Sequence, residues 1–314
     1  MTKMAFLFPG QGSQAVGMGA AMHDNSPVAR DVLATVEEAL GEPFGSLMFE
    51  GPEDDLKMTR NAQPALMTTA LAVTRALEDR LGKSLDTIGD AVAGHSLGEY
   101  AALAAVGTLD IATAARLLRL RGDAMQNAVP VGEGAMAALL GVDIDKVEEL
   151  LSGRDWTALD IANDNAPGQV VISGATADVD DALELAKENG IRKAVKLPVS
   201  APFHCRLMAP AGDAMATALA ATTLHPPSLP VYCNVTARPE TDPSRLRENL
   251  ITQVTGMVRW RETLINMAAD GITRFVEIGT GKVLTGLVKR SLPDAEAISI
   301  ETPEQVDAFV AMLD

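Results

Sequence analysis

The sequence has few of the residues that build disulfide frameworks, metal sites or aromatic cores. Its 314 residues include 2 cysteines and 4 histidines, and aromatic residues make up 4% of the chain against 47% for all hydrophobic residues. Cys205 and Cys233 are too few for a disulfide framework and lie at no metal-ligand spacing, so we expect free thiols, no metal site and a reducing compartment. The core must then be aliphatic, which favours helices packed on a parallel sheet.

Basic residues are scarce as well. The chain has 26 Lys and Arg against 42 Asp and Glu, a net charge of −16. Such a charge argues against nonspecific binding to nucleic acids or anionic membranes. The apolar run near the N-terminus, Met4 to Phe8, ends at Pro9-Gly10 and is too short for a signal peptide or a membrane span. We expect a cytoplasmic protein with no membrane or nucleic-acid partner.

Strand and helix patterns alternate along most of the chain, which is typical of an α/β fold. Apolar runs predict strands at 5–8, 91–93, 231–234, 275–278 and 297–300. Helical spacing predicts helices at 27–40, 63–81, 101–106, 110–128, 207–221, 260–270 and 283–290, and another after a capping box at Thr302. The order favours a large α/β-hydrolase-like domain with a parallel sheet.

Between residues 131 and 198 the order changes to strand, helix, two closely spaced strands, helix, strand. The expected strands span 135–140, 158–162, 170–173 and 193–197, and the expected helices span 144–151 and 179–189. This βαββαβ order is that of ferredoxin-like folds. We therefore predict an inserted ferredoxin-like domain at 131–198, within a catalytic domain formed by 1–130 and 199–314.

The most informative motif is Gly-His-Ser-Leu-Gly-Glu-Tyr at Gly94 to Tyr100, which contains G-x-S-x-G between a predicted strand and a predicted helix. This context is that of a nucleophile elbow, which would hold Ser96 on a sharp turn with its hydroxyl exposed. A β-carbon at Gly94 or Gly98 would collide in so tight a turn. The first amides of the following helix lack helical partners, so they can stabilise an oxyanion. The motif predicts a catalytic serine.

A serine nucleophile needs a neighbouring base to take its proton. His95 adjoins Ser96 in sequence, but at an elbow the neighbouring side chain points away. His23 and His225 lie in polar segments that we expect at the surface. His204 follows a proline turn where the chain re-enters the large domain, so we predict that it is the base. A buried structural histidine is the alternative.

The helix expected after Asp110 carries one arginine on an unusual face. Its apolar stripe consists of Ile111, Ala114, Ala115, Leu118, Gly122 and Met125. Arg116 and Arg119 lie opposite this stripe, whereas Arg121 falls within about 60° of its centre and points inward. A buried cation needs an anion. Both an ion pair within the protein and a bidentate pair with a substrate carboxylate satisfy this need.

Several short motifs, spread in order along nearly the whole chain, are together typical of one protein family. They are Phe8-Pro9-Gly10-Gln11-Gly12-Ser13-Gln14, Gln63-Pro64-Ala65, Gly94 to Tyr100, Arg121-Gly122, Asn163 with Pro167 to Val170, Phe203-His204 and Gly281 to Leu284. Their order and spacing resemble the malonyl-CoA:acyl carrier protein transacylases of type II fatty acid synthesis. The resemblance implies two substrates, malonyl-CoA and a phosphopantetheinylated acyl carrier protein, and no cofactor. We expect a monomer.

The resemblance also implies roles for individual residues. Ser96 would be the acylated nucleophile of a ping-pong transfer, with His204 as its base. The backbone amides of Gln11 and Leu97 would form the oxyanion hole. A backbone carbonyl, at Gln253 in this chain, would orient the histidine in place of an Asp or Glu.

Substrate contacts follow from the same resemblance. Arg121 would bind the free carboxylate of the malonyl group, and Gln63 and Asn163 would line the pocket. Because the acyl carrier protein is acidic, a basic docking patch is also expected. Our candidates for it are Arg206, Lys282, Lys289 and Arg290.

Two other functions share some of these features. A thioesterase or esterase has the same elbow but needs an acidic triad member, for which Asp160 and Asp164 are the candidates, and an acyl pocket without a buried cation. A noncatalytic protein that binds acyl carriers is the second alternative. The presence of both Ser96 and His204 argues against it.

Overall fold

Two β-sheets organise the chain in the computed structural model, which describes residues 2–199 and 201–313. The larger sheet has six strands in the order β10-β9-β1-β2-β7-β8, and all neighbours are parallel except β7 and β8. These strands are β1 (Lys3–Phe8), β2 (Ala91–Gly94), β7 (Val231–Tyr232), β8 (Pro239–Glu240), β9 (Ile272–Ile278) and β10 (Glu296–Ile300). The parallel sheet expected from the alternating pattern is confirmed.

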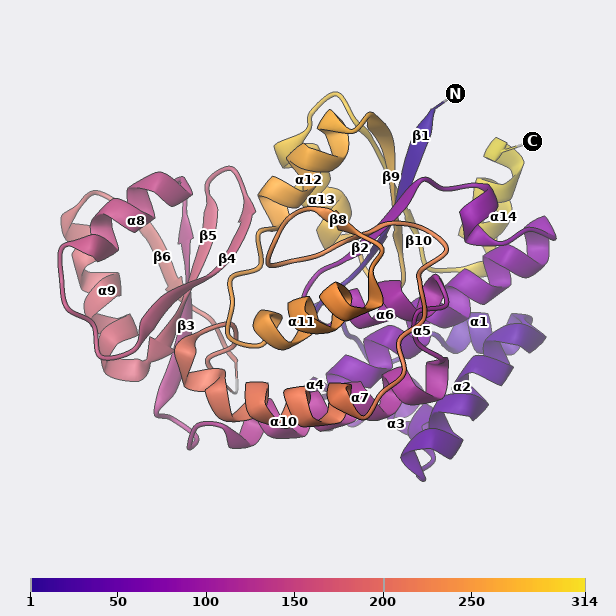
Figure 1. Ribbon diagram of the computed structural model, residues 1–314, viewed down its shortest axis with the longest axis horizontal. Helices are drawn as coiled ribbons and strands as arrows, with labels where there is room; N and C mark the ends of the chain where they lie inside the picture. Colours follow the sequence, from indigo (N-terminus) through magenta and orange to yellow (C-terminus); the bar gives the residue numbers. More distant parts are fainter. Residues whose placement is uncertain (1, 200, 314) are drawn as a thin grey trace.

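Helices cover both faces of this sheet, as Figure 1 shows. The covering helices include α2 (Pro27–Leu40), α5 (Thr59–Leu81), α6 (Gly98–Ala105), α7 (Ile111–Asn127), α10 (Ala209–Ala220), α12 (Trp260–Ala269), α13 (Val283–Ser291) and α14 (Pro303–Leu313). Successive side chains of β1 enter different cores: Phe6 and Phe8 pack with the first helices, whereas Ala5 and Leu7 pack with α12 and α13. Burial on both faces explains why β1 reads as a continuous apolar run.

Four helices and one strand lack a clear signal in the sequence. They are α1 (Ala20–Asn25), α3 (Phe44–Glu50), α4 (Glu53–Lys57), α11 (Pro243–Gln253) and β8. The first three span less than two turns, which is too short for a helical period to stand out. Helix α11 is longer, and Asp242 caps it, accepting a hydrogen bond from the Ser244 amide, with Pro243 at the first helical position. This Asp-Pro pair was its available start signal.

The second sheet belongs to the segment between α7 and α10, drawn on the left of Figure 1. It has four antiparallel strands in the order β4-β5-β3-β6. Its elements in chain order are β3 (Gly134–Leu140), α8 (Ile144–Ser152), β4 (Leu159–Ala166), β5 (Gln169–Ala175), α9 (Thr176–Glu188) and β6 (Lys193–Lys196). Helices α8 and α9 pack on one face through Val147, Leu150 and Val179.

Strand β4 is longer than its predicted span of 158–162. Two register shifts, at Ile161/Asn163 and at Asp164/Ala166, let the strand bend and continue beside β5. Polar residues in this extension hid it from a pattern of apolar runs. The extension also carries Asn163 to the large sheet's side, where its backbone bridges to Val258.

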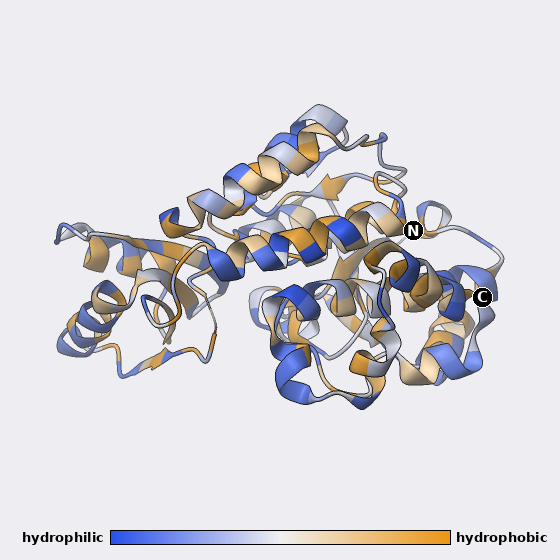
Figure 2. Ribbon diagram, turned by 90° about the horizontal axis from the view of Figure 1, so that it is seen from below, coloured by the Kyte–Doolittle hydropathy of each residue, from blue (hydrophilic) through white to orange (hydrophobic). Residues whose placement is uncertain are grey.

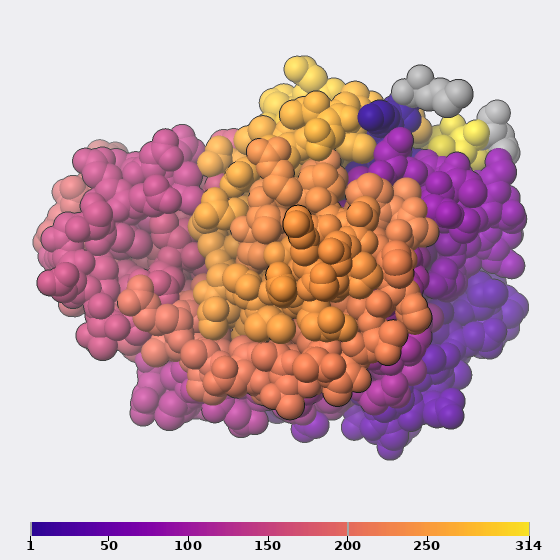
Figure 3. All heavy atoms as spheres, viewed as in Figure 1, coloured from indigo at the N-terminus to yellow at the C-terminus, as the bar shows by residue number. Residues whose placement is uncertain are grey.

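The two sheets form distinct lobes of one molecule. Figure 2 shows the smaller lobe reaching out to one side, and many helices show hydrophilic and hydrophobic residues side by side, as in amphipathic surface helices. In Figure 3 the orange segment after residue 200 covers the front of the larger lobe and adjoins the smaller one. Across residues 2–199 and 201–313, the helices are too short or too polar to span a membrane.

Candidate active site

Ser96 lies on the turn between β2 and α6, with its backbone in the left-handed region at φ 52°. Such a conformation costs a non-glycine residue roughly 1–3 kcal/mol and is typical of functional sites. The turn is tight: a β-carbon on Gly94 would lie 1.9 Å from the carbonyl carbon of Gly98, and one on Gly98 would lie 2.2 Å from the Phe8 oxygen. Both glycines are therefore steric requirements of the elbow.

His204 contacts Ser96 across a long stretch of chain. The Ser96 hydroxyl and His204 Nε2 are 2.7 Å apart, and His204 Nδ1 lies 2.8 Å from the backbone oxygen of Gln253. Because a carbonyl oxygen only accepts, the second bond places the ring proton on Nδ1, which leaves the Nε2 lone pair facing the hydroxyl. The geometry suits His204 to take the Ser96 proton.

The surroundings of His204 favour its neutral form. Burial, and then the neighbouring Arg121 cation, lower its pKa from 6.5 to about 3. A neutral imidazole can accept a proton at neutral pH without first losing one. The ring is therefore ready to act as a base, although its low basicity requires that the developing charge be stabilised elsewhere in the site.

This low pKa predicts an unusual pH profile. Acylation of Ser96 by an uncharged thioester should keep most of its rate down to about pH 5, where a histidine of ordinary pKa would be mostly protonated. Single-turnover acylation measured between pH 5 and pH 8 tests this. A fall in rate centred near pH 6.5 would contradict the assignment. Circular dichroism is the control, because a histidine buried as the neutral form destabilises the fold as the pH drops below its unfolded value of 6.5.

Arg121 is buried, and its guanidinium points at the nucleophile. Its Nη1 donates to Gln63 Oε1 at 2.8 Å, and its Nη2 donates to Gln253 Oε1 at 2.9 Å and to Ser96 Oγ at 3.2 Å. All three acceptors are neutral. Within residues 2–199 and 201–313, none of the ion pairs includes Arg121. The cation thus lies beside the nucleophile without a carboxylate bonded to it.

The approach of α7 to α5 brings Arg121 to this position. A β-carbon on Gly122 would lie 2.5 Å from the Cα of Arg60 on α5, so only glycine permits the crossing. Asp110 caps α7 as expected, since its side chain accepts from the Thr113 amide. The cap and the close crossing fix the register of α7, which sets the direction of Arg121.

The two amides expected to form an oxyanion hole lie on the elbow itself, at Leu97, and on the loop after β1, at Gln11. Leu97 is the first residue before α6, and Gln11 follows β1 and lines the cavity. No hydrogen bond found in the described part of the chain uses the backbone N–H of either residue. The Gln11 side chain donates to Thr59 Oγ1 at 3.2 Å, which holds its loop in place.

A cavity of about 670 Å³ opens over Ser96, between the two lobes. Its polar wall includes Gln11, Gln63, Arg121, Asn163 and His204. Apolar side chains from both lobes complete it: Met125, Met136, Val171, Leu197, Val199 and Phe203. Most of the residues selected from the sequence therefore meet in one cavity, and the side chains of Leu97 and Gln253 are not part of its lining.

The acidic residues considered for a hydrolase triad are elsewhere. Asp160 pairs with Arg206 at 2.6 Å, and Asp164 pairs with Arg261 at 2.9 Å. His95 turns away from the nucleophile and bonds through Nε2 to Asn165 Oδ1 at 2.8 Å. A backbone carbonyl therefore occupies the position where an α/β-hydrolase would place its carboxylate.

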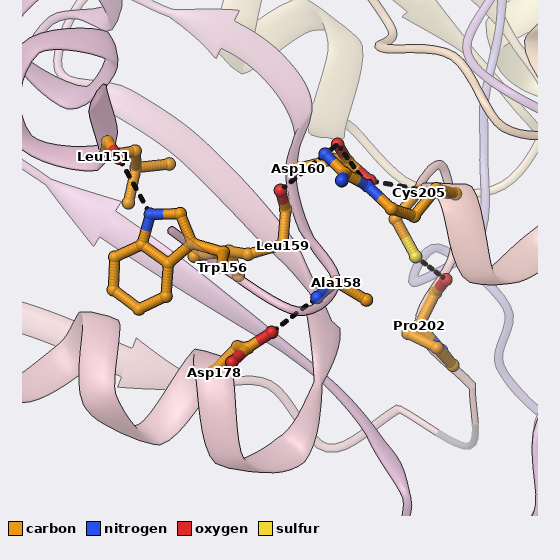
Figure 4. Close-up of polar contacts among 9 residues, drawn as sticks. Leu151, Trp156, Ala158, Leu159, Asp160, Asp178, Pro202 and Cys205 are labelled. Atoms are coloured by element: carbon orange, nitrogen blue, oxygen red, sulfur yellow. Dashed lines mark hydrogen bonds and ion pairs between the residues drawn. The ribbon is translucent and has the colours of Figure 1, made fainter. Parts of the chain in front are cut away.

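The proposed basic patch is not a set of free cations. The Arg206 guanidinium and backbone amide both bond to Asp160 on β4, which ties the two lobes together. Figure 4 shows Asp160 close to Cys205, the residue before Arg206. Arg290 donates to Gln169 Oε1 at 2.8 Å. Arg206 serves the junction between lobes, so we remove it from the patch.

Two site residues gave no functional signal in the sequence. Glu99 and Asn234 are both buried, and the Asn234 side chain accepts from the Ser96 amide at 2.7 Å and donates to the Gly94 oxygen at 2.7 Å. A charged residue inside the alanine-rich helix after the elbow was the available clue to Glu99. Asn234 lies just past a short strand, where nothing in the sequence marks it.

Known proteins match this chain over its full length. Residues 5–304 match the family described as acyl transferase domain. The malonyl CoA-acyl carrier protein transacylase of Bacillus subtilis (strain 168) is 42% identical over 315 residues, which is 100% of this chain and 98% of that protein.

Solved structures of other proteins also match this chain over nearly its full length. The acyl-carrier-protein-S-malonyltransferase from Bartonella henselae is 48% identical, with a TM-score of 0.95 and coverage of 99% of both chains. A malonyl-transacylase solved in complex with its type II PKS acyl-carrier protein is 36% identical, with a TM-score of 0.94, and the match covers 99% of this chain and 100% of that chain.

Proposed function

The chain belongs to the malonyl CoA-acyl carrier protein transacylases, and from that membership we propose how its own residues carry the malonyl group from coenzyme A to an acyl carrier protein. The activity supplies fatty acid synthesis. Acyl carrier protein is the expected partner, since one relative was solved with such a protein bound.

The first half of the proposed reaction forms an ester on Ser96. Its Oγ attacks the thioester carbonyl of malonyl-CoA while His204 Nε2 takes the hydroxyl proton, along the 2.7 Å contact between them. The amides of Gln11 and Leu97 stabilise the oxyanion. Collapse of the tetrahedral intermediate breaks the C–S bond, and the proton on His204 passes to the leaving thiolate of coenzyme A.

The second half runs in the opposite direction. The phosphopantetheine thiol of the carrier protein gives its proton to His204, and its sulfur attacks the ester carbonyl. Ser96 Oγ then leaves and takes the proton back from His204. Across both halves, one thioester is consumed and one is formed. Because the malonyl group is held on Ser96 between the two halves, the transfer is ping-pong. Side chains, amides and the two substrates account for every step, so no cofactor is invoked.

A single observation carries this proposal: Arg121 Nη2 lies 3.2 Å from Ser96 Oγ, so that a cation and the nucleophile share one cavity. A simple esterase has no use for a buried cation there. A bidentate, charge-assisted pair with the free carboxylate of malonate would hold the acyl group against the serine. Gln63 and Asn163 flank the same cavity and would contact the acyl donor.

The two sheets support a finer description of the fold. We propose an α/β-hydrolase-like catalytic domain of residues 1–130 and 199–314 with a ferredoxin-like insertion at 131–198. The antiparallel order β4-β5-β3-β6 of the small sheet supports the second half of this description. We also expect the enzyme to act as a monomer.

Intact-protein mass spectrometry tests the function directly. After brief exposure to malonyl-CoA, the protein should gain the mass of one malonyl group, and peptide mapping should place it on Ser96. The adduct should persist in buffer and disappear when a phosphopantetheinylated carrier protein is added. Rapid loss of the adduct in buffer alone would identify a hydrolase, and the absence of any adduct would identify a binding protein.

A further inference from the structure

Glu99 is a buried carboxyl group for which the transfer reaction has no step. It lies on α6, on the helix turn that follows Ser96, and its side chain is 0% exposed. Its Oε2 accepts from the Asn234 amide at 3.0 Å and from Gln253 Nε2 at 2.9 Å. Its Oε1 is buried and accepts no hydrogen bond of ordinary geometry in the described part of the chain, although the Cys233 thiol lies close to the carboxyl group. Placing a carboxyl group here opposes folding, which calls for a functional reason.

The burial of Glu99 also raises the pKa of its carboxyl group. Burial raises its pKa to about 7, against the opposing effects of the bonds from Asn234 and Gln253 and of the Arg121 cation. Both its charged and neutral forms keep Oε2 as an acceptor. Its contacts to Asn234 and Gln253 therefore do not depend on which form is present.

The Glu99 carboxyl group is one of the acceptors that decide which way the Gln253 amide faces. Gln253 Nε2 donates to Glu99 Oε2 and also to the Ser96 backbone oxygen at 3.0 Å. Both of those atoms are acceptors, so the amide nitrogen must face them. A flipped amide would set oxygen against oxygen there and would turn its NH2 group toward a guanidinium. Gln253 Oε1 is thereby committed to Arg121 Nη2, at 2.9 Å.

We propose that Glu99 is a positioning residue for malonyl selection, which acts through Gln253 to hold the Arg121 guanidinium in line with the acyl group on Ser96. The proposal rests on the function proposed above. The guanidinium is held from two sides, by Gln253 Oε1 and by Gln63 Oε1. Fixing the planar fork before the carboxylate arrives lowers the entropy lost on binding it.

Glu99 is linked to Arg121 through Gln253, and a second path of hydrogen bonds links it to the nucleophile through Asn234. Glu99 also accepts from the Asn234 amide, and the Asn234 side chain accepts from the Ser96 amide. This branch influences every acyl group equally, because every acyl group is attached to Ser96. The Gln253 branch influences only acyl groups that pair with Arg121. The ratio of malonyl to acetyl transfer therefore isolates the proposed role from a general structural role.

The test compares kcat/KM for malonyl-CoA and for acetyl-CoA across five proteins. They are wild type, Glu99→Gln, Glu99→Leu, Gln253→Leu and the Glu99→Leu/Gln253→Leu double variant. Leucine keeps the side-chain volume of Glu99 while removing both acceptors, and Gln253→Leu keeps the backbone carbonyl that orients His204. Glu99→Gln keeps one acceptor in place. If the Leu variant does not fold, Glu99→Ser, which leaves a short polar side chain unable to reach Gln253, replaces it in the same comparison.

We expect Glu99→Leu to lower the malonyl to acetyl ratio by about tenfold, the effect of losing one well-placed hydrogen bond to a charged group. Gln253→Leu should lower it by a similar factor, and the double variant should be no worse than either single variant, because both changes break one chain of contacts. Glu99→Gln should restore the ratio to within about threefold of wild type, since one carbonyl oxygen can take both hydrogen bonds.

Two results would overturn the positioning role. One is an unchanged ratio in Glu99→Leu, with both substrates slowed alike, which would make Glu99 structural. The other is additive losses in the double variant, which would separate Glu99 from Gln253. A wild-type enzyme that does not prefer malonyl-CoA would instead contradict the function proposed above, so the two failures are distinguishable.

Discussion

Replacing Ser96 with Ala is expected to abolish the acyl-enzyme. Removing Oγ removes the atom that lies 2.7 Å from His204 Nε2 and would attack the thioester, while alanine fits the same turn. His204→Ala should leave the nucleophile in place but slow acylation by at least ~100-fold, a usual contribution of a general base. Rapid-quench measurement of the malonyl adduct gives both values.

The matched control is His225→Ala, which removes an exposed histidine far from Ser96 in the sequence. It should acylate at the wild-type rate. An adduct that forms at full rate on the Ser96→Ala protein would show that another residue is the nucleophile. Full-rate acylation of His204→Ala would show that the 2.7 Å contact is structural.

Replacing Arg121 with Ala is expected to change which acyl group the enzyme accepts. The buried guanidinium donates to three neutral acceptors, so it should contribute a few kcal/mol to binding of the malonyl carboxylate, roughly a 100-fold or larger effect on malonyl transfer. Acetyl and other uncharged groups never pair with it, so their transfer should be unchanged or faster. Arg121→Lys should recover only part of the loss, because an ammonium group lacks the planar fork.

The decisive quantity is the ratio of malonyl to acetyl transfer in wild type and in Arg121→Ala. Arg116→Ala is the control on the same helix, since Arg116 is exposed and donates to the nearby Thr113 hydroxyl. Its ratio should match wild type. Thermal denaturation of each variant separates selectivity from stability. An unchanged ratio in a folded Arg121→Ala protein would make Arg121 a structural residue.

Local sequence signals predicted the sharp turn at Ser96 and the inward direction of Arg121, and the structure has both features. Gly94 is required by a contact within the elbow itself, whereas Gly98 is required by the close approach of Phe8 at the end of β1. The apolar stripe of α7 likewise fixes the inward direction of Arg121, because helical spacing determines which residues share a face. In both cases a local pattern of residue types gave the prediction, although contacts with Phe8 and Arg60 from other parts of the chain complete the geometry.

Short or polar elements escaped the same reasoning. Helices α3 and α4 are too short to show a period, and the extension of β4 depends on bulges beside β5 rather than on apolar alternation. These elements exist because of what they pack against. The residues that stabilise these elements come from other parts of the chain, so the local sequence does not predict them.

By itself the sequence determined the alternation of strands and helices, the elbow at Ser96, the capped helix after Asp110 and the inward face of Arg121. Only the tertiary structure decided which partners these groups meet. His204 reaches Ser96 across 108 positions, and Gln253 reaches the Ser96 backbone across 157. The atom that orients His204 is a backbone oxygen, which every residue has, and the Gln253 amide faces two distant acceptors, the Ser96 backbone oxygen and the buried carboxyl group of Glu99. The type of each side chain reflects local propensity and burial. These contacts instead depend on which distant backbone segments the completed fold brings together.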